Sequence, residues 1–354
     1  MITSLRLQHF RSFTDSLFEF EPGVNIIVGP NASGKTSILE ALHMLAGGAL
    51  FKGNEADVVQ FDADWMRLDE VLDTDSTRVI KLERSGELFK KSYVLDDVAK
   101  ARLSEHQQLP LVLFEPSLLH MLAGEPALRR EFLDGVLVYT VHGYGQTLKN
   151  YRRALAQRNT LLKRQQVRHQ PTELFVWDLR LSDLGGALFA ARSQFVATLQ
   201  TTLPPHYKSI SGRDDEISIA YETSIDTADY TNNLLKKLHS SYDKDIARGF
   251  TGSGPHRDDL LLSINGHDAR SSASRGESRS LLLALKIAEL EALERARGVR
   301  PTLLLDDVFS ELDGHRRRAL ADTIKHYQTF ITTTDADVVI EHFSQKAHII
   351  PLSR

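Results

Sequence analysis

Cysteine is absent from the 354-residue sequence, and so is any apolar run of the roughly 18 residues that a membrane-spanning helix needs. Without cysteine the chain forms no disulfide, no thiolate metal site and no cysteine nucleophile. The first six residues, Met1 to Arg6, lack the apolar core of a signal peptide. Together these absences favour a protein of the reducing cytoplasm.

Excess positive charge is also absent, because the formal net charge is −4 at pH 7. The chain therefore lacks a uniformly basic coat, and any surface that binds nucleic acid must be a local patch. A hydrophobic fraction of 42% and a charged fraction of 25% are ordinary for a globular protein. The length fits roughly two domains, and the sequence has neither internal repeats nor low-complexity segments.

The most informative segment is GPNASGKT, which fits the phosphate-binding loop pattern G-x-x-x-x-G-K-[ST]. Residues 24–28 before it predict a buried strand and residues 37–42 after it begin a helix, which is the context that the motif needs. Loop N–H groups and the helix N-terminus would face phosphate oxygens, Lys35 would reach the β- and γ-phosphates, and the Thr36 hydroxyl would ligate Mg²⁺. The predicted nucleotide-binding residues are Gly29, Pro30, Asn31, Ala32, Ser33, Gly34, Lys35 and Thr36.

An apolar stretch over residues 303–305 leads directly into two carboxylates, Asp306 and Asp307. Ligands of open α/β sheets bind at the carboxyl ends of the strands, so this stretch predicts a strand that carries Asp306 to the phosphate loop. There Asp306 would hold Mg²⁺, and Asp307 would orient or deprotonate the attacking water. Taken alone, the two acids are equally typical of a strand that ends in solvent; the phosphate loop favours the first interpretation.

A third motif, Ser274-Arg275-Gly276-Glu277, precedes a helix that is predicted over residues 279–297, with Gly298 as its C-terminal cap. The Ser274 hydroxyl and the Gly276 N–H would lie at a helix N-terminus, where phosphate binds well. Taken alone, an N-cap followed by a small-residue loop explains this motif better. Its place shortly before the acidic strand favours phosphate binding.

In this order and separation, the three motifs resemble the head domain of ABC-type ATPases. Ser274–Glu277 resembles the signature motif of that family, and the segment 310–313 resembles its D-loop. Residues 7–13 resemble the opening of chromosome-maintenance and recombination ATPases rather than that of transporters. The stretches 124–134, 157–163, 254–260 and 305–313 extend the resemblance to bacterial recombination mediators, over essentially the whole chain.

The resemblance implies an α/β fold in which both ends of the chain build one ABC-type ATPase head. We predict that residues 1–116 and 207–354 form the head, and that residues 117–206 form an inserted helical arm. Two heads of this family dimerise head-to-tail around two ATP molecules, so Ser274 and Gly276 would bind the ATP of the partner. Lys35 and Asp307 would be catalytic.

The resemblance further implies a cytoplasmic, nucleoid-associated protein of recombinational repair, a weak ATPase that DNA stimulates. It would bind single-stranded and gapped duplex DNA and act with RecO and RecR to load RecA. Two departures from the family matter. Glu277 stands where the family has Gln, and Asp307 stands where most ABC ATPases have Glu, which suggests slow hydrolysis.

An acid-free stretch points to the DNA contacts: residues 135–172 contain seven Lys or Arg and neither Asp nor Glu. At helical spacing most of these bases fall opposite an apolar stripe, which is the expected footprint of phosphate-backbone contacts, although a solvated face has the same pattern. For Arg129 and Arg130 the alternative is a structural pairing with nearby acids. The predicted DNA contacts are Lys149, Arg152, Arg153, Arg158, Lys163 and Arg164, and the seventh base is Arg168.

Two other functions remain open at this point. A transporter-type ATPase subunit would need a coupling surface on a short helical subdomain, and a phosphate-loop kinase would need a lid for a second substrate. Two assignments also stay open. Gln60 is a possible metal-sensing glutamine, and Thr332-Thr333-Thr334 either sense the γ-phosphate or simply finish a strand.

Overall fold

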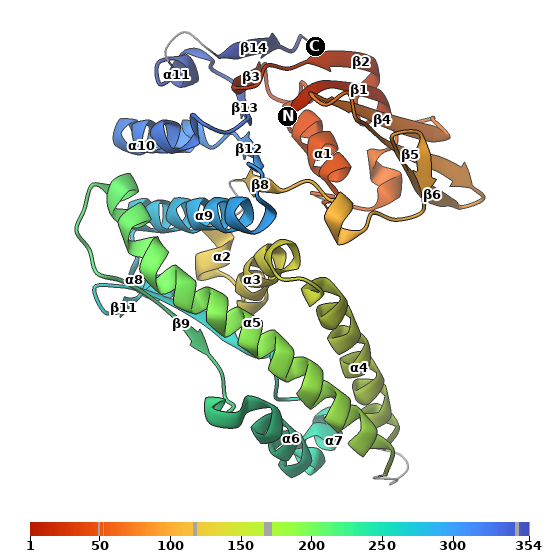
Figure 1. Cartoon of the computed structure of the whole chain (residues 1–354), viewed down its shortest axis with the longest axis vertical. Coiled ribbons are helices and arrows are strands. Elements are labelled where there is room, and N and C mark those ends of the chain that lie inside the picture. The colour runs from red at the N-terminus through yellow and green to blue at the C-terminus, as the bar shows by residue number, and fades with distance from the viewer. Residues whose placement is uncertain (49, 52, 116–118, 166–171, 344–346, 354) are drawn as a thin grey trace. The chain divides into compact units, whose positions relative to one another are not determined.

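The computed structural model (Figure 1) describes the whole chain except residues 49, 52, 116–118, 166–171, 344–346 and 354. The chain divides into two compact units. Unit 1 consists of residues 1–118 and 289–354, and unit 2 consists of residues 119–288.

Unit 1 contains an antiparallel sheet of six strands. Alternation of apolar and polar residues forms its strands: in β1, Leu5, Leu7 and Phe10 are buried while neighbouring residues reach the surface. A turn was expected at Asp15-Ser16, but both residues pair within β2, because the chain already reverses after Phe10. The strand order is β2 (Phe13–Glu19), β1 (Ile2–Phe10), β4 (Trp65–Leu72), β5 (Thr77–Ser85), β6 (Leu88–Leu95) and β7 (Val98–Lys100).

The second sheet of unit 1 is parallel, and it joins segments from both ends of the sequence. Its register sets Thr332 between Asp306 on one neighbouring strand and Ile27 on the other. The sequence patterns at residues 24–28, 302–306 and 329–333 are those of buried strands, and three strands have these bounds in the structure. The strand order is β14 (His348–Pro351), β3 (Val24–Val28), β13 (Thr329–Thr333), β12 (Thr302–Asp306) and β8 (Leu111–Phe114).

Helix α1 (Lys35–Ala46) follows the phosphate loop and packs between the two sheets (Figure 1). Its buried side chains, such as Ile38 and Leu42, share one apolar cluster with Leu7 and Leu68 of the antiparallel sheet and Phe330 of the parallel sheet. Burial on both sides fixes the helix, and with it the loop at its N-terminus. The remaining helices of the unit are η1 (Glu55–Val58), η2 (Glu105–Gln107), η5 (Phe309–Glu311), α10 (Gly314–Ile324) and α11 (Asp337–Ile340).

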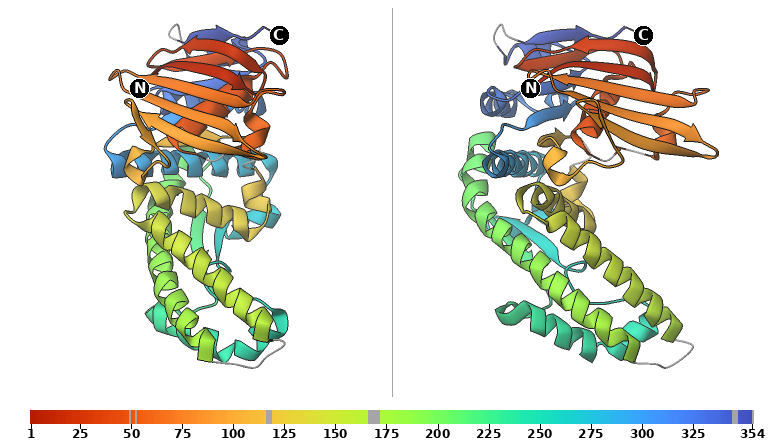
Figure 2. Two further views of the ribbon diagram at one scale, coloured as in Figure 1. Left: turned by 90° about the vertical axis from the view of Figure 1, so that its right-hand side faces the viewer. Right: turned by 45° about the vertical axis from the view of Figure 1, so that its right-hand side comes forward.

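Unit 2 is mainly helical, and α4 and α5 lie side by side in it (Figure 2). Its helices are α2 (Leu119–Ala123), α3 (Pro126–Thr140), α4 (Tyr144–Gln165), α5 (Thr172–Ser211), η4 (Thr227–Asp229), α6 (Tyr230–Ser240), α7 (Tyr242–Arg248) and α8 (Ala269–Ser272). A small antiparallel sheet contains β9 (Ile217–Glu222), β10 (Asp259–Ile264) and β11 (His267–Asp268). Helix α9 (Arg275–Arg297) begins in unit 2 and ends in unit 1.

The end of α5 differs from the prediction, which placed a loop at Pro204-Pro205. The helix continues through both prolines to Ser211. Two prolines remove two backbone donors from a helix, but the fully buried Leu203, Tyr207 and Ile210 keep the last turns packed. The compact unit that contains α5 continues to residue 288, so residues 207–288 belong to unit 2. The arm predicted from the sequence ends earlier, at residue 206.

Candidate functional site

The phosphate loop has the backbone that its glycines allow. Gly34 adopts a φ of 96°, and a Cβ there would lie 2.7 Å from the ring of Phe13, so only glycine fits. The Lys35 Nζ donates to the carbonyl oxygens of Gly29 at 2.8 Å and of Pro30 at 2.9 Å. The ammonium group thus lies against the loop. The first N–H groups of α1 have no helical acceptors, so they can donate to a ligand at the start of the helix.

The predicted metal ligands meet where β12 ends. The Thr36 Oγ1 donates to the Asp306 carboxylate, with its oxygens at 3.0 and 3.1 Å. The Thr332 Oγ1 lies 2.7 Å from the Asp306 Oδ1 and accepts a hydrogen bond from the Asp307 N–H at 3.0 Å. Thr332 therefore holds both acids in place. From the sequence alone, its role stayed open between sensing the γ-phosphate and finishing a strand.

Asp307 has a backbone that is rare for a residue with a side chain. Its φ is 51°, in the left-handed region, and strain of this kind persists where the surrounding structure requires it. Its Oδ1 is buried and accepts no hydrogen bond within the described part of the chain. Its carbonyl accepts from Ser310 Oγ at 2.7 Å, in the segment that resembles a D-loop. An unpartnered buried carboxylate oxygen is suited to hold a water molecule.

These groups line one cavity of about 840 Å³ in unit 1. The size is within the range of about 300–1,000 Å³ that ligand pockets have. Nine of its lining residues come from the phosphate loop, the acidic strand end and the turn after β1, one is Ser37 of α1, and the other four come from the segment around η1. The lining residues are Arg11, Ser12, Asn31, Ala32, Gly34, Lys35, Thr36, Ser37, Ala56, Asp57, Val59, Phe61, Asp306 and Asp307.

Sequence analysis assigned no role to seven residues of this cavity, and two of them, Arg11 and Phe61, have side chains that matter for its shape. Arg11 forms a bidentate ion pair with Glu40 of α1, at 2.9 and 3.0 Å, which ties the turn after β1 to the helix of the phosphate loop. Phe61 lines the cavity although its side chain is 91% exposed, and no motif marks it. Gln60 does not line the cavity; its amide contacts His9 and Thr14.

The residues present fit a Mg²⁺ ion together with a triphosphate. Thr36 and Asp306 supply hard oxygen ligands, as Mg²⁺ requires, and would hold the ion while phosphate and water complete its shell. Among the described residues no three His, Cys, Asp or Glu gather as a metal site. When bound there, the ion neutralises phosphate charge.

The third motif forms a capping box at the start of α9. The Ser274 Oγ accepts from the Glu277 N–H at 3.3 Å, and the Glu277 carboxylate accepts from the Ser274 N–H at 2.9 Å. Glu277 also pairs with Arg213 at 3.1 Å. These hydrogen bonds lower the pKa of Glu277. The carboxylate that departs from the family motif is thus engaged locally.

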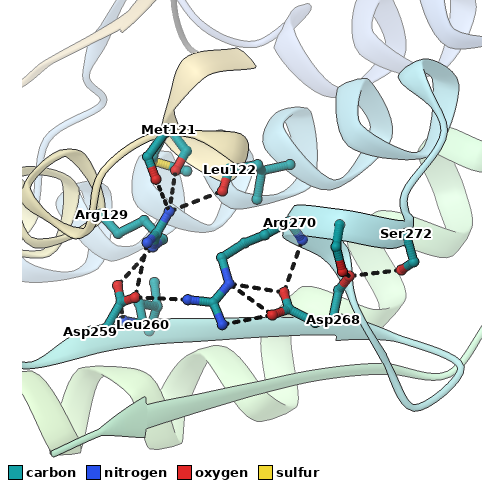
Figure 3. Close-up of polar contacts among 10 residues, drawn as sticks. Met121, Leu122, Arg129, Asp259, Leu260, Asp268, Arg270 and Ser272 are labelled. Carbon is teal, nitrogen blue, oxygen red and sulfur yellow. Dashed lines mark hydrogen bonds and ion pairs between the residues drawn. The ribbon is translucent and has the colours of Figure 1, made fainter.

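A network of buried charges supports the chain that leads to this motif (Figure 3). Arg129 donates to both oxygens of Asp259, at 2.7 and 2.9 Å, and to three carbonyls at the end of α2, those of Met121, Leu122 and Gly124. Arg270 joins the same Asp259 to Asp268, which precedes α8. Arg129 is therefore structural, and Arg130, which donates to the Asp258 carbonyl at 2.8 Å, also binds within the unit.

One predicted DNA contact is wrong. Arg158 is fully buried, and its guanidinium bonds Asp178 at 2.6 Å, Asp245 at 2.7 Å and the Thr251 hydroxyl at 2.9 Å. The side chain crosses from α4 into the core of the unit, so it reaches no DNA. The other predicted contacts, Lys149, Arg152, Arg153, Lys163 and Arg164, are exposed on α4. Arg168 lies outside the described residues.

Comparison with known proteins identifies the family to which this fold and site belong. Residues 1–350 match the model of the RecF/RecN/SMC N terminal domain family. The chain is 38% identical to the DNA replication and repair protein RecF of Streptococcus suis (strain 05ZYH33), over 94% of this chain and 92% of the relative. It is 34% identical to the same protein of Bacillus subtilis (strain 168), over 95% and 94%.

The chain belongs to the RecF/RecN/SMC family. A solved structure of the recombination mediator protein RecF with ATPrS, in the RecFOR pathway, has a TM-score of 0.86 to this fold at 28% identity, and covers 96% of this chain and 94% of that one. An Smc head bound to the C-winged helix domain of ScpA has a TM-score of 0.57 at 16% identity, which reflects the fold alone. The predicted α/β ABC-type ATPase head is confirmed.

Proposed function

We propose that this chain is an ATP-dependent DNA-binding protein of recombinational repair and replication-fork maintenance. ATP closes a head-to-tail homodimer, and slow hydrolysis reopens it. The chain acts in the cytoplasm, at the nucleoid, on gapped, single-stranded and duplex DNA, and helps RecO and RecR to load RecA. Relatives at 33–38% identity are DNA replication and repair proteins, and the RecF structures with ATP belong to a RecFOR pathway, which supports this role.

The observation that carries the proposal is the chain of contacts from Thr36 to Asp307. The Thr36 hydroxyl, the Asp306 carboxylate and the Thr332 hydroxyl lie in hydrogen-bond contact, and Thr332 orients the Asp307 backbone. The same cavity thus offers ligands for Mg²⁺, the ammonium of Lys35 for phosphate and a carboxylate for the attacking water. Asp307 is one methylene shorter than the usual Glu, which favours slow turnover.

The start of α9 supports a site shared between two copies. Among the described residues, the Ser274 Oγ bonds only inside its capping box, and a hydroxyl has further acceptor and donor capacity. Within the described residues, no acceptor lies within hydrogen-bond reach of the Gly276 N–H. We propose that both groups bind the γ-phosphate of ATP held by the partner. ATP then favours the closed dimer through contacts that ADP lacks, which makes the protein a two-state switch.

The exposed bases of α4 support a DNA surface. Helix α4 contains no Asp or Glu, so its surface charge attracts phosphates locally although the whole chain is acidic. We keep residues 117–206 as the proposed DNA-binding arm and residues 1–116 and 207–354 as the head. Among the described residues no helix is both long and apolar enough to cross a bilayer. A transporter subunit or a kinase would give these bases no role.

The experiment that tests this function measures molar mass in solution with Mg²⁺ and ATP, with Mg²⁺ and ADP, and without nucleotide. A dimer with ATP and a monomer with ADP are expected, and DNA should raise the rate of ATP hydrolysis. A mass that is the same in all three conditions, together with turnover that DNA leaves unchanged, would contradict the proposal.

Lys35→Ala is the matched control for nucleotide dependence. It removes the ammonium and its two hydrogen bonds to loop carbonyls, neither of which is fully buried, so its thermal stability without nucleotide should stay close to that of the wild type. ATP should no longer dimerise the variant. Tight ATP binding by Lys35→Ala would move the nucleotide site elsewhere.

A further inference from the structure

A second cavity, of about 370 Å³, lies in unit 2 between α4 and α5. It is lined by Asn150, Arg153, Ala154 and Gln157 from α4 and by Trp177 and Arg180 from α5. The α4 residues are three or four positions apart, so they share one face of that helix. The cavity thus joins a predicted DNA contact, Arg153, to a tryptophan that no motif explains.

The side chains of this cavity combine three kinds of chemistry. Trp177 is only half-buried, so its indole has an accessible face. Arg153 and Arg180 are exposed and have no ion-pair partner among the described side chains. Asn150 and Gln157 carry amides, each with two donors and an acceptor. Among the side chains that the structure describes, no acidic residue lines the cavity.

The absence of acid matters, because the two buried arginines described on this pair of helices are already bound to carboxylates. Arg158 pairs with Asp178 and Asp245, and Arg192 pairs with Asp134. Arg153 and Arg180 are therefore available for an external anion. An indole for stacking, cations for phosphate and amides for ring edges are together the groups that bind single-stranded nucleic acid.

We infer that this cavity binds an unpaired nucleobase of DNA, with Trp177 stacked on the base and Arg153 and Arg180 on the flanking phosphates. The inference rests on the proposed DNA-binding function of the arm and names what it recognises: a base that is free of its partner strand. Duplex DNA keeps its bases stacked, so it can contact the exposed lysines and arginines of α4 but cannot fill the cavity. A single-stranded gap offers both.

Tryptophan fluorescence tests this directly, since the chain has two tryptophans, Trp65 and Trp177. The variant Trp65→Phe leaves Trp177 as the only reporter. With ATP and Mg²⁺ at fixed concentration, oligothymidylate should quench its emission, while an abasic oligonucleotide of the same length and a blunt duplex should not. Quenching by duplex to the same extent, or none by oligothymidylate, would overturn the inference.

Affinity variants give the second readout. Base stacking on an aromatic side chain predicts that Trp177→Ala weakens oligothymidylate binding about 5- to 150-fold, and that Trp177→Phe restores most of it. Phe175→Ala is the matched control, because Phe175 is exposed on the same helix but does not line the cavity. Equal losses in Trp177→Ala and Phe175→Ala would overturn the inference.

The two proposals fail differently. If a labelled oligonucleotide binds the wild type but Trp177 reports nothing, the base site is wrong and DNA binding by the arm stands. If no DNA binds at all, the proposed function fails and the base site fails with it. Thymidine monophosphate is the last ligand to be tested. If it quenches the emission of Trp177 with the same affinity as the oligonucleotide, the cavity binds free nucleotides, and its assignment to DNA is overturned.

Discussion

At the scale of single residues, Asp307 combines a left-handed backbone with a buried carboxylate oxygen that has no partner among the described residues. An asparagine tolerates the left-handed region as well as an aspartate does. Asp307→Asn therefore changes the charge and basicity of the side chain with little change in backbone strain.

We predict that Asp307→Asn binds ATP normally and hydrolyses it about 10²- to 10⁴-fold more slowly, since this is what a general base or water-orienting group contributes. The ATP-bound dimer should persist correspondingly longer after ATP is removed. Single-turnover hydrolysis and the lifetime of the dimer measure both effects. Unchanged turnover would assign the base to another residue.

Glu70 shows what burial does to a carboxyl group without hydrogen bonds. Both of its oxygens are buried and accept no hydrogen bond from any described residue. The Arg78 guanidinium lies 3.6 Å away, but it donates to the Leu45 carbonyl instead. Burial raises the pKa of Glu70 to about 7, from 4.5 for an exposed glutamate.

The raised pKa gives a pH-dependent stability with a definite sign. The folded state binds the Glu70 proton more tightly than the unfolded chain does, so this contribution is fully present below about pH 4.5 and is lost as pH rises through about 7. We predict that the melting temperature of Glu70→Gln falls less than that of the wild type over this interval. The two proteins differ only at position 70, so the difference between their profiles isolates Glu70. Parallel pH profiles would show that Glu70 is ionised throughout.

At the scale of elements, the parallel strands and the phosphate loop could be predicted because each depends on local sequence. Three strands have the bounds that their apolar runs indicate. The fate of Arg158 could not be predicted, because its partners Asp178 and Asp245 are 20 and 87 residues away. The roles of Phe61 and Thr332 could not be predicted either. The turn after η1 brings Phe61 to the cavity, and the register of β13 against β12 brings Thr332 to Asp306.

Helix α4 now permits a sharper test of DNA binding than its sequence did. Arg152 lies 3.7 Å from Asp134, and both residues line a further cavity of unit 2 together with the buried Arg192. Reversing the charge of Arg152 would therefore disturb the unit. Lys149, Lys163 and Arg164 are exposed and have no ion pair with any described residue. Their replacement by Glu should leave the fold and ATP binding intact.

We predict that the triple variant Lys149→Glu, Lys163→Glu, Arg164→Glu binds DNA more weakly, with the salt slope on duplex DNA reduced by roughly 0.9 for each phosphate that the arm no longer neutralises. Binding isotherms at several salt concentrations measure this. A matched control reverses Lys236, Lys237 and Lys244, which lie on α6 and α7. The arm would prove to be only a solvated face if both variants kept the wild-type affinity and slope.

At the scale of the whole molecule, the proposed head-to-tail dimer would make each active site a property of two chains. Ser274→Arg should bind one ATP per monomer but fail to dimerise, because a bulky cation blocks the start of α9. Lys35→Ala offers an intact Ser274 but holds no ATP. We predict that mixing the two rebuilds one composite site of two, with partial ATPase activity.

Two outcomes decide between shared and separate sites. A mixture that is as inactive as either variant alone argues against sites shared between subunits. Full ATPase activity of Ser274→Arg by itself would show that each monomer hydrolyses ATP independently, and the dimer mechanism would have to be withdrawn.

The parallel sheet has a consequence for synthesis of the chain. β3 carries the phosphate loop, and both of its neighbours, β13 and β14, come from residues 329–351. A ribosome therefore completes the whole helical unit before the strand under the phosphate loop gains a partner on either side. Because domains fold as units during translation, we expect that a nascent chain cannot bind nucleotide through this loop until residues 329–351 have been synthesised.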